Sequence, residues 1–459
     1  MAENPEPPHD PGPPEATEAP PAPPGPPRRR TWSRIASWLL ILAAVAASQS
    51  PRDAGPQTGP DDTMSLQLMG RYAVGMKSIL GDASALRQGI PQMEKALEVS
   101  DNPRKHLFFI PILMELDASD RAYETLERLA AEPGDRAVAG DAAAFLRLYR
   151  QGYSALSPEQ FTAIYRYGWI GKLALAYGRE DSDPVRQKVV RAARRTFIAS
   201  GIFALVAVAA LAAGAVLLVT AVVLRGSGRL KARLAPPEST GETLLEAFAL
   251  FLSGLITLPA VGRHLSTGAG LAASFFTIPV MVLALAWPAI RGSRWRDVRA
   301  ALGWHRGEGV LREIGAGIVG YLAGLPLLAL ALVPVLILSR FAGSVPSHPI
   351  VEEISGNPLT IALILALGCL WAPVVEETFF RGMLFGHLRR RRHWAVSAAL
   401  TGLVFAAIHP QGWMAVPLLG TIGFTLGAIR EWRGSIIAPM TAHALNNGAV
   451  LLLATILLA

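Results

Sequence analysis

Three short polar motifs lie in otherwise apolar sequence near the C-terminal end, and their residue types suit general acid–base chemistry. The motif residues are Glu376, Glu377, Arg381, His409, His443 and Asn447. A desolvated carboxylate has a raised pKa and can take a proton from water near neutral pH, with an imidazole as a second proton acceptor. Imidazole and amide N–H groups can donate to an oxygen that gains negative charge. Together these groups could activate a water molecule as a nucleophile.

Helical spacing in the first motif predicts different surroundings for its two adjacent acids. Glu377 and Arg381 are four residues apart and would share one face of a helix, where they can pair. Glu376 would point about 100° away and remain free to face a cavity. A purely structural ion pair is the alternative, but it leaves Glu376 unpaired in hydrocarbon.

The other two motifs also follow helical spacing. Phe405 precedes His409 by one turn and could pack on its ring, while His443 and Asn447 project from one helix face. On its own, His409 would more often be a structural histidine, and the alternative for His443 and Asn447 is polar contact between helices. Glu246 is a lone acid in another apolar stretch, and we interpret it as interfacial.

Composition indicates that membrane helices must position these side chains. Hydrophobic residues make up 51% of the 459 residues and charged residues only 17%, below the roughly 25% of soluble proteins. Each apolar stretch is near or above the roughly 17 residues that a membrane helix needs. The predicted spans are an N-terminal anchor and 197–224, 243–261, 268–290, 313–339, 359–386, 394–410, 413–429 and 434–458. We therefore expect an all-α transmembrane bundle of about eight spans plus the anchor.

The chain divides into five predicted segments. These are a disordered Pro-rich tail at 1–31, a signal-anchor helix at 32–49, a soluble helical domain at 50–195, a span with a basic loop at 196–240 and a membrane domain at 241–459. The anchor resembles a signal peptide in its arginines and apolar core, but its long preceding tail favours a retained helix. In the soluble segment, Leu126, Leu129 and Ala130 fall on one helical face.

Charge in the short loops predicts the orientation in the membrane. Alternate loops hold sixteen Lys and Arg residues, whereas the opposite set holds two. The positive-inside rule places the sixteen in the cytoplasm, the N-terminus with them, and residues 50–195 outside. A basic run from Arg186 to Arg195 beside the second span disagrees with this orientation. The net charge of +8 is thereby explained without a nucleic-acid partner, for which no motif exists.

Similar depth in the bilayer links the three motifs. Glu376, His409, His443 and Asn447 lie 10 to 17 residues from the nearest arginine of a basic loop. At the helical rise per residue this is roughly 15–25 Å. Ionisable groups at such depth are costly and usually functional, so we expect the motifs to converge on one site.

At these residues the sequence resembles the CPBP family of intramembrane proteases, which includes CAAX prenyl endopeptidases and bacteriocin-processing proteins. The family pattern is Glu-Glu-x-x-x-Arg, Phe-x-x-x-His and His-x-x-x-Asn on separate helices, and every position matches here over about residues 240–459. The resemblance implies an endopeptidase that cuts a peptide bond within the membrane. Its substrate would be a membrane-associated or lipidated protein.

The resemblance leaves two mechanisms open. In one, Glu376 and His409 activate water directly, His443 and Asn447 stabilise the oxyanion, and Arg381 holds Glu377. In the other, Glu376, His409 and His443 bind a divalent metal, with zinc the usual candidate. The His-Glu-x-x-His helix of many zinc proteases is absent, and we favour the metal-free version.

Two other functions remain open from the sequence. One is a non-catalytic membrane scaffold or immunity factor of the same family, acting through residues 50–195. The other is a proton-coupled transporter, although no duplicated halves are visible. In each case we expect a multi-pass protein of the plasma or inner membrane, if the source is bacterial.

Overall fold

The described part of the chain is entirely helical in its regular structure. The computed structural model describes residues 28–49, 62–81, 84, 86–91, 102–132, 134–235, 240–265, 270–342 and 358–458. Within these ranges every regular element is a helix, which confirms the predicted all-α fold. Residues 1–27 of the predicted tail and the first residues of the predicted soluble domain, 50–61, lie outside the described residues. Residues 28–31, predicted as part of the tail, belong to the helix Arg28–Ser48.

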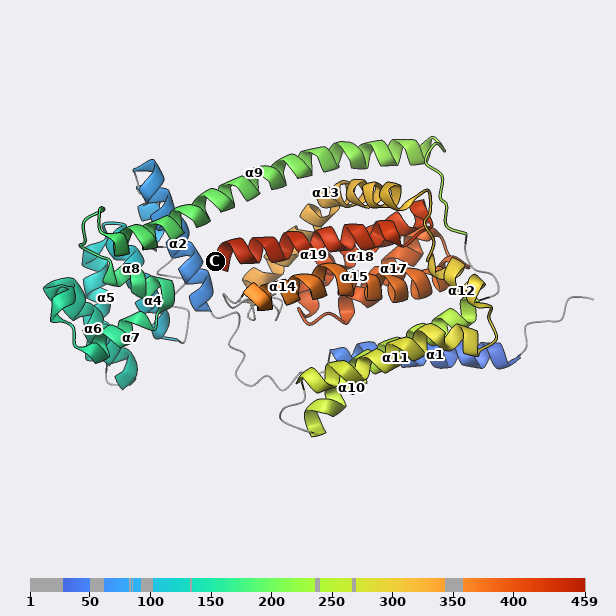
Figure 1. The fold of residues 1–459 in the computed structure, drawn as a ribbon, viewed down its shortest axis with the longest axis horizontal. Coiled ribbons are helices and arrows are strands. Elements are labelled where there is room, and N and C mark those ends of the chain that lie inside the picture. The colour runs from blue at the N-terminus through green and yellow to red at the C-terminus, as the bar shows by residue number, and fades with distance from the viewer. Residues whose placement is uncertain are drawn as a thin grey trace, which may run out of the picture.

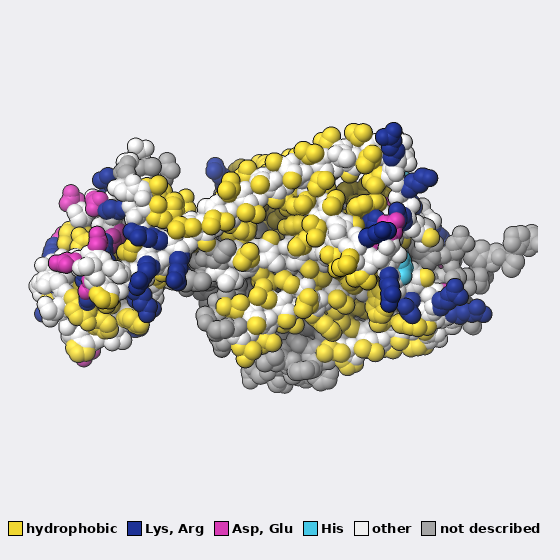
Figure 2. Space-filling model, turned by 45° about the horizontal axis from the view of Figure 1, so that its top comes forward, with side chains coloured by type: hydrophobic (Ala, Val, Ile, Leu, Met, Phe, Trp, Pro, Cys, Tyr) yellow, Lys and Arg dark blue, Asp and Glu magenta, His cyan; other side chains and the backbone are white. Residues whose placement is uncertain are grey.

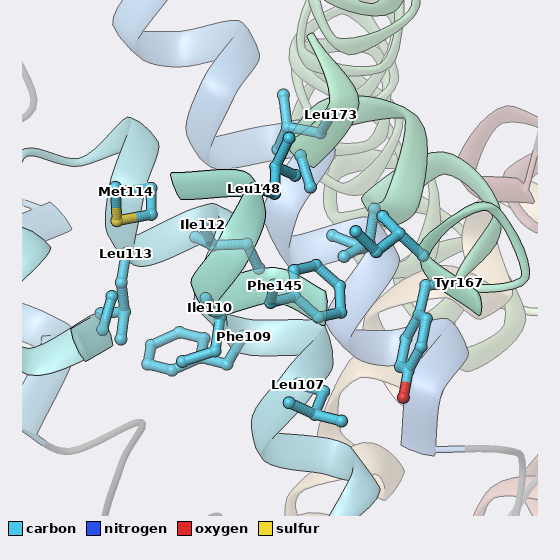
Figure 3. Packing of buried hydrophobic residues seen from close by; sticks show 14 of the residues in the cluster. Leu107, Phe109, Ile110, Ile112, Leu113, Met114, Phe145, Leu148, Tyr167 and Leu173 are labelled. Carbon is cyan, nitrogen blue, oxygen red and sulfur yellow. The ribbon is translucent and has the colours of Figure 1, made fainter. Parts of the chain in front are cut away.

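Residues 62–195 form a helical domain with its own apolar core (Figures 1 and 3). Its helices are α2 (Asp62–Leu80), α4 (Arg104–Glu115), α5 (Ser119–Ala131), α6 (Arg136–Gln151), α7 (Pro158–Tyr165), α8 (Gly168–Leu175) and the start of α9 (Pro184–Gly226). Leu126 and Leu129 are buried in this core and Ala130 packs against it, as their spacing predicted. Asp135, Ser157 and Asp183 accept hydrogen bonds from the first turns of α6, α7 and α9, which explains where these helices begin.

A single helix of 43 residues, α9, joins this domain to the membrane bundle. It passes through the predicted boundary at residue 195 without a break. In each half of α9, a glycine allows a neighbouring helix to pack closely against it. A Cβ on Gly75 of α2 would lie 2.4 Å from the Ala193 carbonyl oxygen, and a Cβ on Gly214 would lie 2.2 Å from that of Leu322. The helical domain is therefore packed directly onto a membrane helix.

The remaining helices form the membrane bundle (Figure 1). They are α1 (Arg28–Ser48), α10 (Gly241–Leu265), α11 (Gly270–Ile290), α12 (Trp295–Leu302), α13 (Val310–Ala342), α14 (Pro358–Ala366), α15 (Ala372–Glu376), α16 (Phe385–Arg389), α17 (Trp394–Ala407), α18 (Val416–Arg433) and α19 (Ile437–Leu458). Each predicted span corresponds to a helix or a continuous helical run.

Seven helices of the described chain are long and apolar enough to cross a membrane. The span predicted at 394–410 is shorter than expected, because α17 has 14 residues and ends at Ala407. Pro410 explains the early end, since a proline disfavours helical conformation in the residue before it and has no N–H to donate.

Lys and Arg side chains gather at the end of the bundle opposite the helical domain (Figure 2). Arg433 bonds Glu313 at 2.7 Å and Glu308 at 2.8 Å, and Arg233 also pairs with Glu308. These two arginines lower the pKa of the Glu308 carboxyl to about 2. This clustering agrees with the predicted loop topology, and the assignment of this end to the cytoplasm stays a prediction.

Glu246 links three helices near that end. Its carboxylate accepts hydrogen bonds from Ser33 of α1, from Trp287 Nε1 of α11 at 2.8 Å and from Arg291 Nε at 3.0 Å. An acid with three donors is a structural anchor, in agreement with its interfacial interpretation.

Candidate active site

The helical run from Pro358 to Arg389 contains two π-helical stretches that flank Glu376. They are η3 (Leu367–Trp371) and η4 (Glu377–Leu384). In the first, the Ala372 N–H bonds the carbonyl of Leu367, five residues back. Pro373 cannot donate to the next carbonyl, that of Gly368, because it has no N–H. Such π-bulges are frequent at functional sites.

Glu377 lies at the centre of a buried polar cluster. Its Oε1 accepts a hydrogen bond from Arg381 Nη1 at 3.0 Å and lies 2.8 Å from His443 Nδ1 on α19. The side chains of Glu377 and Arg381 are completely buried. Arg381 Nη2 also donates to the Gly423 carbonyl of α18 at 3.2 Å. The predicted Glu377–Arg381 contact is therefore present, and it joins three parts of the bundle.

Glu376 approaches the same histidine from the other side. Its Oε2 lies 3.8 Å from His443 Nε2, and the Glu376 side chain keeps 28% exposure. Within the described chain, no donor bonds this oxygen. His443 thus lies between two carboxylates, one fixed by Arg381 and one available to another partner. The two adjacent acids thus have different surroundings, as helical spacing predicted.

His409 is oriented by the end of α17. Its Nδ1 lies 2.6 Å from the carbonyl oxygen of Phe405. A carbonyl only accepts hydrogen bonds, so Nδ1 carries the proton and the neutral ring has its free lone pair on Nε2. The backbone N–H of His409 bonds the Ala406 carbonyl at 3.2 Å, which leaves the Phe405 carbonyl to the side chain. The ring therefore offers one nitrogen as a base.

Phe405 joins the three motifs through ring contacts. Its ring centroid lies 4.3 Å from that of His409, 6.0 Å from that of His443 and 4.8 Å from the Arg381 guanidinium carbon. The predicted packing of Phe405 on His409 is thus present. Both imidazole rings therefore contact the ring of Phe405. The acid pair, both histidines and the arginine consequently belong to one cluster.

Asn447 is placed near the cluster but already has a backbone partner. Its Nδ2 donates to the Gly368 carbonyl at 2.8 Å. This is the carbonyl that Pro373 leaves without a helical donor, so Asn447 completes the π-helical stretch. One N–H of the amide remains for other use, and its role as an oxyanion donor stays a prediction.

Asn447→Ala is expected to reduce the free energy of unfolding by about 1–3 kcal/mol, the cost of leaving the half-buried Gly368 carbonyl without a donor. Asn446→Ala is the matched control, because Asn446 makes only a 3.4 Å contact to Asn447 Oδ1. Denaturation in mixed micelles measures both. Equal stability of the two variants would show that the bond to Gly368 contributes nothing.

The proposed metal ligands are Glu376, His409 and His443. Among the described residues, no group of three His, Cys, Asp or Glu side chains is arranged to hold an ion. The Nδ1 atoms of His409 and His443 are engaged by Phe405 and Glu377, as is usual for histidines that bind a metal through Nε2. The Nε2 atoms of both histidines and the Glu376 carboxylate are thus left as possible N/O donors, so metal dependence stays a prediction.

Two features of the site were not visible in the sequence. The contact of His443 with Glu377 joins residues 66 positions apart, and helical spacing alone gives no sign of it. Arg430 was counted with a basic loop, but the structure buries it completely within α18. It donates to the carbonyls of Ala301 at 3.1 Å and Arg381 at 3.4 Å, and so supports the helix that carries the acids.

Comparisons with known proteins agree with the motif resemblance. Residues 358–449 match the family described as type II CAAX prenyl endopeptidase Rce1-like. A segment of 71 residues is 38% identical to the uncharacterized protein YpbD of Bacillus subtilis, covering 15% of this chain and 33% of that protein. An uncharacterized 24.3 kDa protein of Escherichia coli is 27% identical over 182 residues, covering 38% of this chain and 78% of that protein.

No solved structure shows significant similarity to the chain. The chain spans about a third of the length of the Bacillus relative. The family match contains all six motif residues, so the part of the chain that forms the buried cluster is the part that resembles the CAAX prenyl endopeptidases of the Rce1-like family.

Proposed function

We propose that this protein is an intramembrane endopeptidase that hydrolyses a peptide bond of a membrane-associated or lipidated protein. The observation that carries the proposal is the position of His443 between the carboxylates of Glu376 and Glu377. A structural ion pair explains Glu377 and Arg381. It does not explain why a second acid approaches the same imidazole and keeps an oxygen without a donor in the described chain.

In the proposed reaction, Glu376 and Nε2 of His409 orient a water and accept its proton as its oxygen attacks the peptide carbonyl. His443, held through Nδ1 by Glu377, and the remaining N–H of Asn447 stabilise the oxyanion. Collapse of the intermediate breaks the C–N bond. The proton held by the acid–base pair passes to the leaving amine.

The surroundings of Glu376 favour a substrate that arrives through the lipid. Leu370, Trp371 and Val374 are 68%, 50% and 47% exposed on the same helical run. Exposed apolar side chains at this position suit contact with acyl chains or an apolar peptide. A prenyl group is one such modification, and the choice among lipids is left to experiment.

Purified protein in detergent should cleave members of a peptide library with apolar or lipidated C-termini. Glu376→Ala and His409→Ala are expected to abolish cleavage. Glu242→Gln, at the basic end of α10 where it pairs with Arg390, is the control and should retain it. Cleavage that survives both substitutions would remove these residues from catalysis. No cleavage by the wild type would favour a scaffold role.

We expect cleavage to continue in the presence of a zinc chelator such as 1,10-phenanthroline. The reason is that no group of three possible ligands is arranged to hold an ion among the described residues. The measurement compares initial rates before and after prolonged chelation. A loss of activity that added zinc restores would establish the metal-dependent mechanism instead.

A further inference from the structure

We propose that α1 is a permanent part of the catalytic unit, and that Ser48 and Gln49 are positioning residues for His409. Both side chains bond the carbonyl oxygen of Ala407, two residues before that histidine. The proposal rests on the proposed function, because it assigns the contact a role in the reaction. The contact itself, and the retention of α1, can be tested without activity.

The C-terminal end of α17 creates a need for outside donors. A helix leaves its last carbonyl groups without N–H partners in the chain, and Pro410 removes one more donor at this position. The Phe405 carbonyl is bonded by the His409 ring and the Ala406 carbonyl by the His409 N–H. Both of these donors belong to His409. The carbonyl of Ala407, the next in the chain, still needs a donor.

The end of α1 supplies the missing donors. Ser48 Oγ lies 3.2 Å from the Ala407 oxygen and 2.7 Å from the carbonyl of Val45, while the Gln49 amide bonds Ala407 directly. The residues involved are more than 350 positions apart in the chain. A bond over such a separation fixes the end of one membrane helix against another.

The rest of α1 is also built into the bundle. Ile41 is fully buried and Ala44 nearly so in the apolar cluster shared with α10. Ser33 bonds Glu246, and the ring of Trp38 meets His387 edge-on at 6.3 Å. A segment removed as a signal peptide would expose these partners. We therefore expect α1 to remain in the mature protein.

The consequence concerns where the His409 ring can lie. Its Nδ1 is tied to the Phe405 carbonyl, so any unwinding of the last turn of α17 moves the ring and its free Nε2. Holding Ala407 from α1 prevents that unwinding. Small displacements of a base reduce the rate of the chemical step more than they reduce binding.

The test is the double variant Ser48→Ala/Gln49→Leu, which removes both donors. With a peptide that the wild type cleaves, we expect kcat to fall about ten-fold or more at nearly unchanged KM. Ser48→Thr/Gln49→Lys, which keeps a hydroxyl and an N–H donor, should restore most of kcat. Ser33→Ala is the matched control, because it removes a bond at the opposite end of α1 and should leave kcat unchanged.

An activity-independent arm uses the ¹⁵N resonances of His409, assigned by their loss in His409→Gln. In the donor-free variant they should shift away from the Nδ1–H tautomer, and amide hydrogen exchange at 404–411 should accelerate. Unchanged resonances with unchanged kcat would overturn the positioning role while the proteolytic function stands. If no peptide is cleaved, the spectra alone decide the contact, and unchanged spectra overturn it.

Intact mass of the full-length protein purified from membranes tests the retention of α1. The expected species contains residues 28–49. A single species that begins after residue 49 would overturn the proposal, because the donors to Ala407 would then be absent from the working protein.

Discussion

Glu376→Gln is expected to lower the rate of peptide-bond cleavage by about 10²–10⁴-fold, the range that loss of a positioned general base produces. Gln has nearly the same shape but cannot accept the proton of the attacking water. Because Glu376 is 28% exposed and its Oε2 bonds no donor of the described chain, the substitution should change the free energy of unfolding by less than about 1 kcal/mol. The measurement pairs initial rates with denaturation of the same preparation.

The adjacent acid gives a sharp comparison. Glu377→Gln removes the charge that balances Arg381 and faces His443, so it should lose stability as well as activity. An uncompensated buried guanidinium costs several kcal/mol. If the two variants behave alike, with equal losses of rate and stability, the division between a free and a fixed acid is wrong.

This division is the part of the site that the sequence predicts well. Residues four apart on one helix must share a face, so the contact of Glu377 with Arg381 and that of Phe405 with His409 follow from spacing. The membrane helices are likewise predictable, because each one is a continuous run of apolar residues that can be read directly from the sequence. The π-helical stretches change the helical pitch at the acids without breaking the pair.

Contacts between distant segments were not predictable, because no local rule connects them. Spacing places Asn447 beside His443 on one face, but its partner is set by Pro373 on another helix, through the carbonyl that this proline leaves free. Arg430 has the sequence context of a loop arginine and is buried nonetheless. The donors from Ser48 and Gln49 to α17 likewise depend on the packing of α1 and are invisible in the chain's local pattern.

The largest loss of stability is expected for Arg381→Met. Glu377 would then be a completely buried carboxylate with His443 as its remaining partner. Breaking one side of a buried ion pair costs about 3–5 kcal/mol. Loss of the hydrogen bond to the Gly423 carbonyl and of the cation–π contact with Phe405 would add to it. Denaturation in mixed micelles of sodium dodecyl sulfate and a mild detergent provides the free energy of unfolding.

Two controls separate charge from packing. Arg150→Met removes an exposed pair with Glu127, whose side chains are 53% and 55% exposed, and should cost less than about 1 kcal/mol. Glu377→Gln/Arg381→Met removes both buried charges and should recover most of the stability that Arg381→Met loses. Its activity should stay low, because His443 would lose the carboxylate that orients its Nδ1–H. A double variant as unstable as Arg381→Met would show that shape, rather than charge balance, holds the helix that carries Glu376.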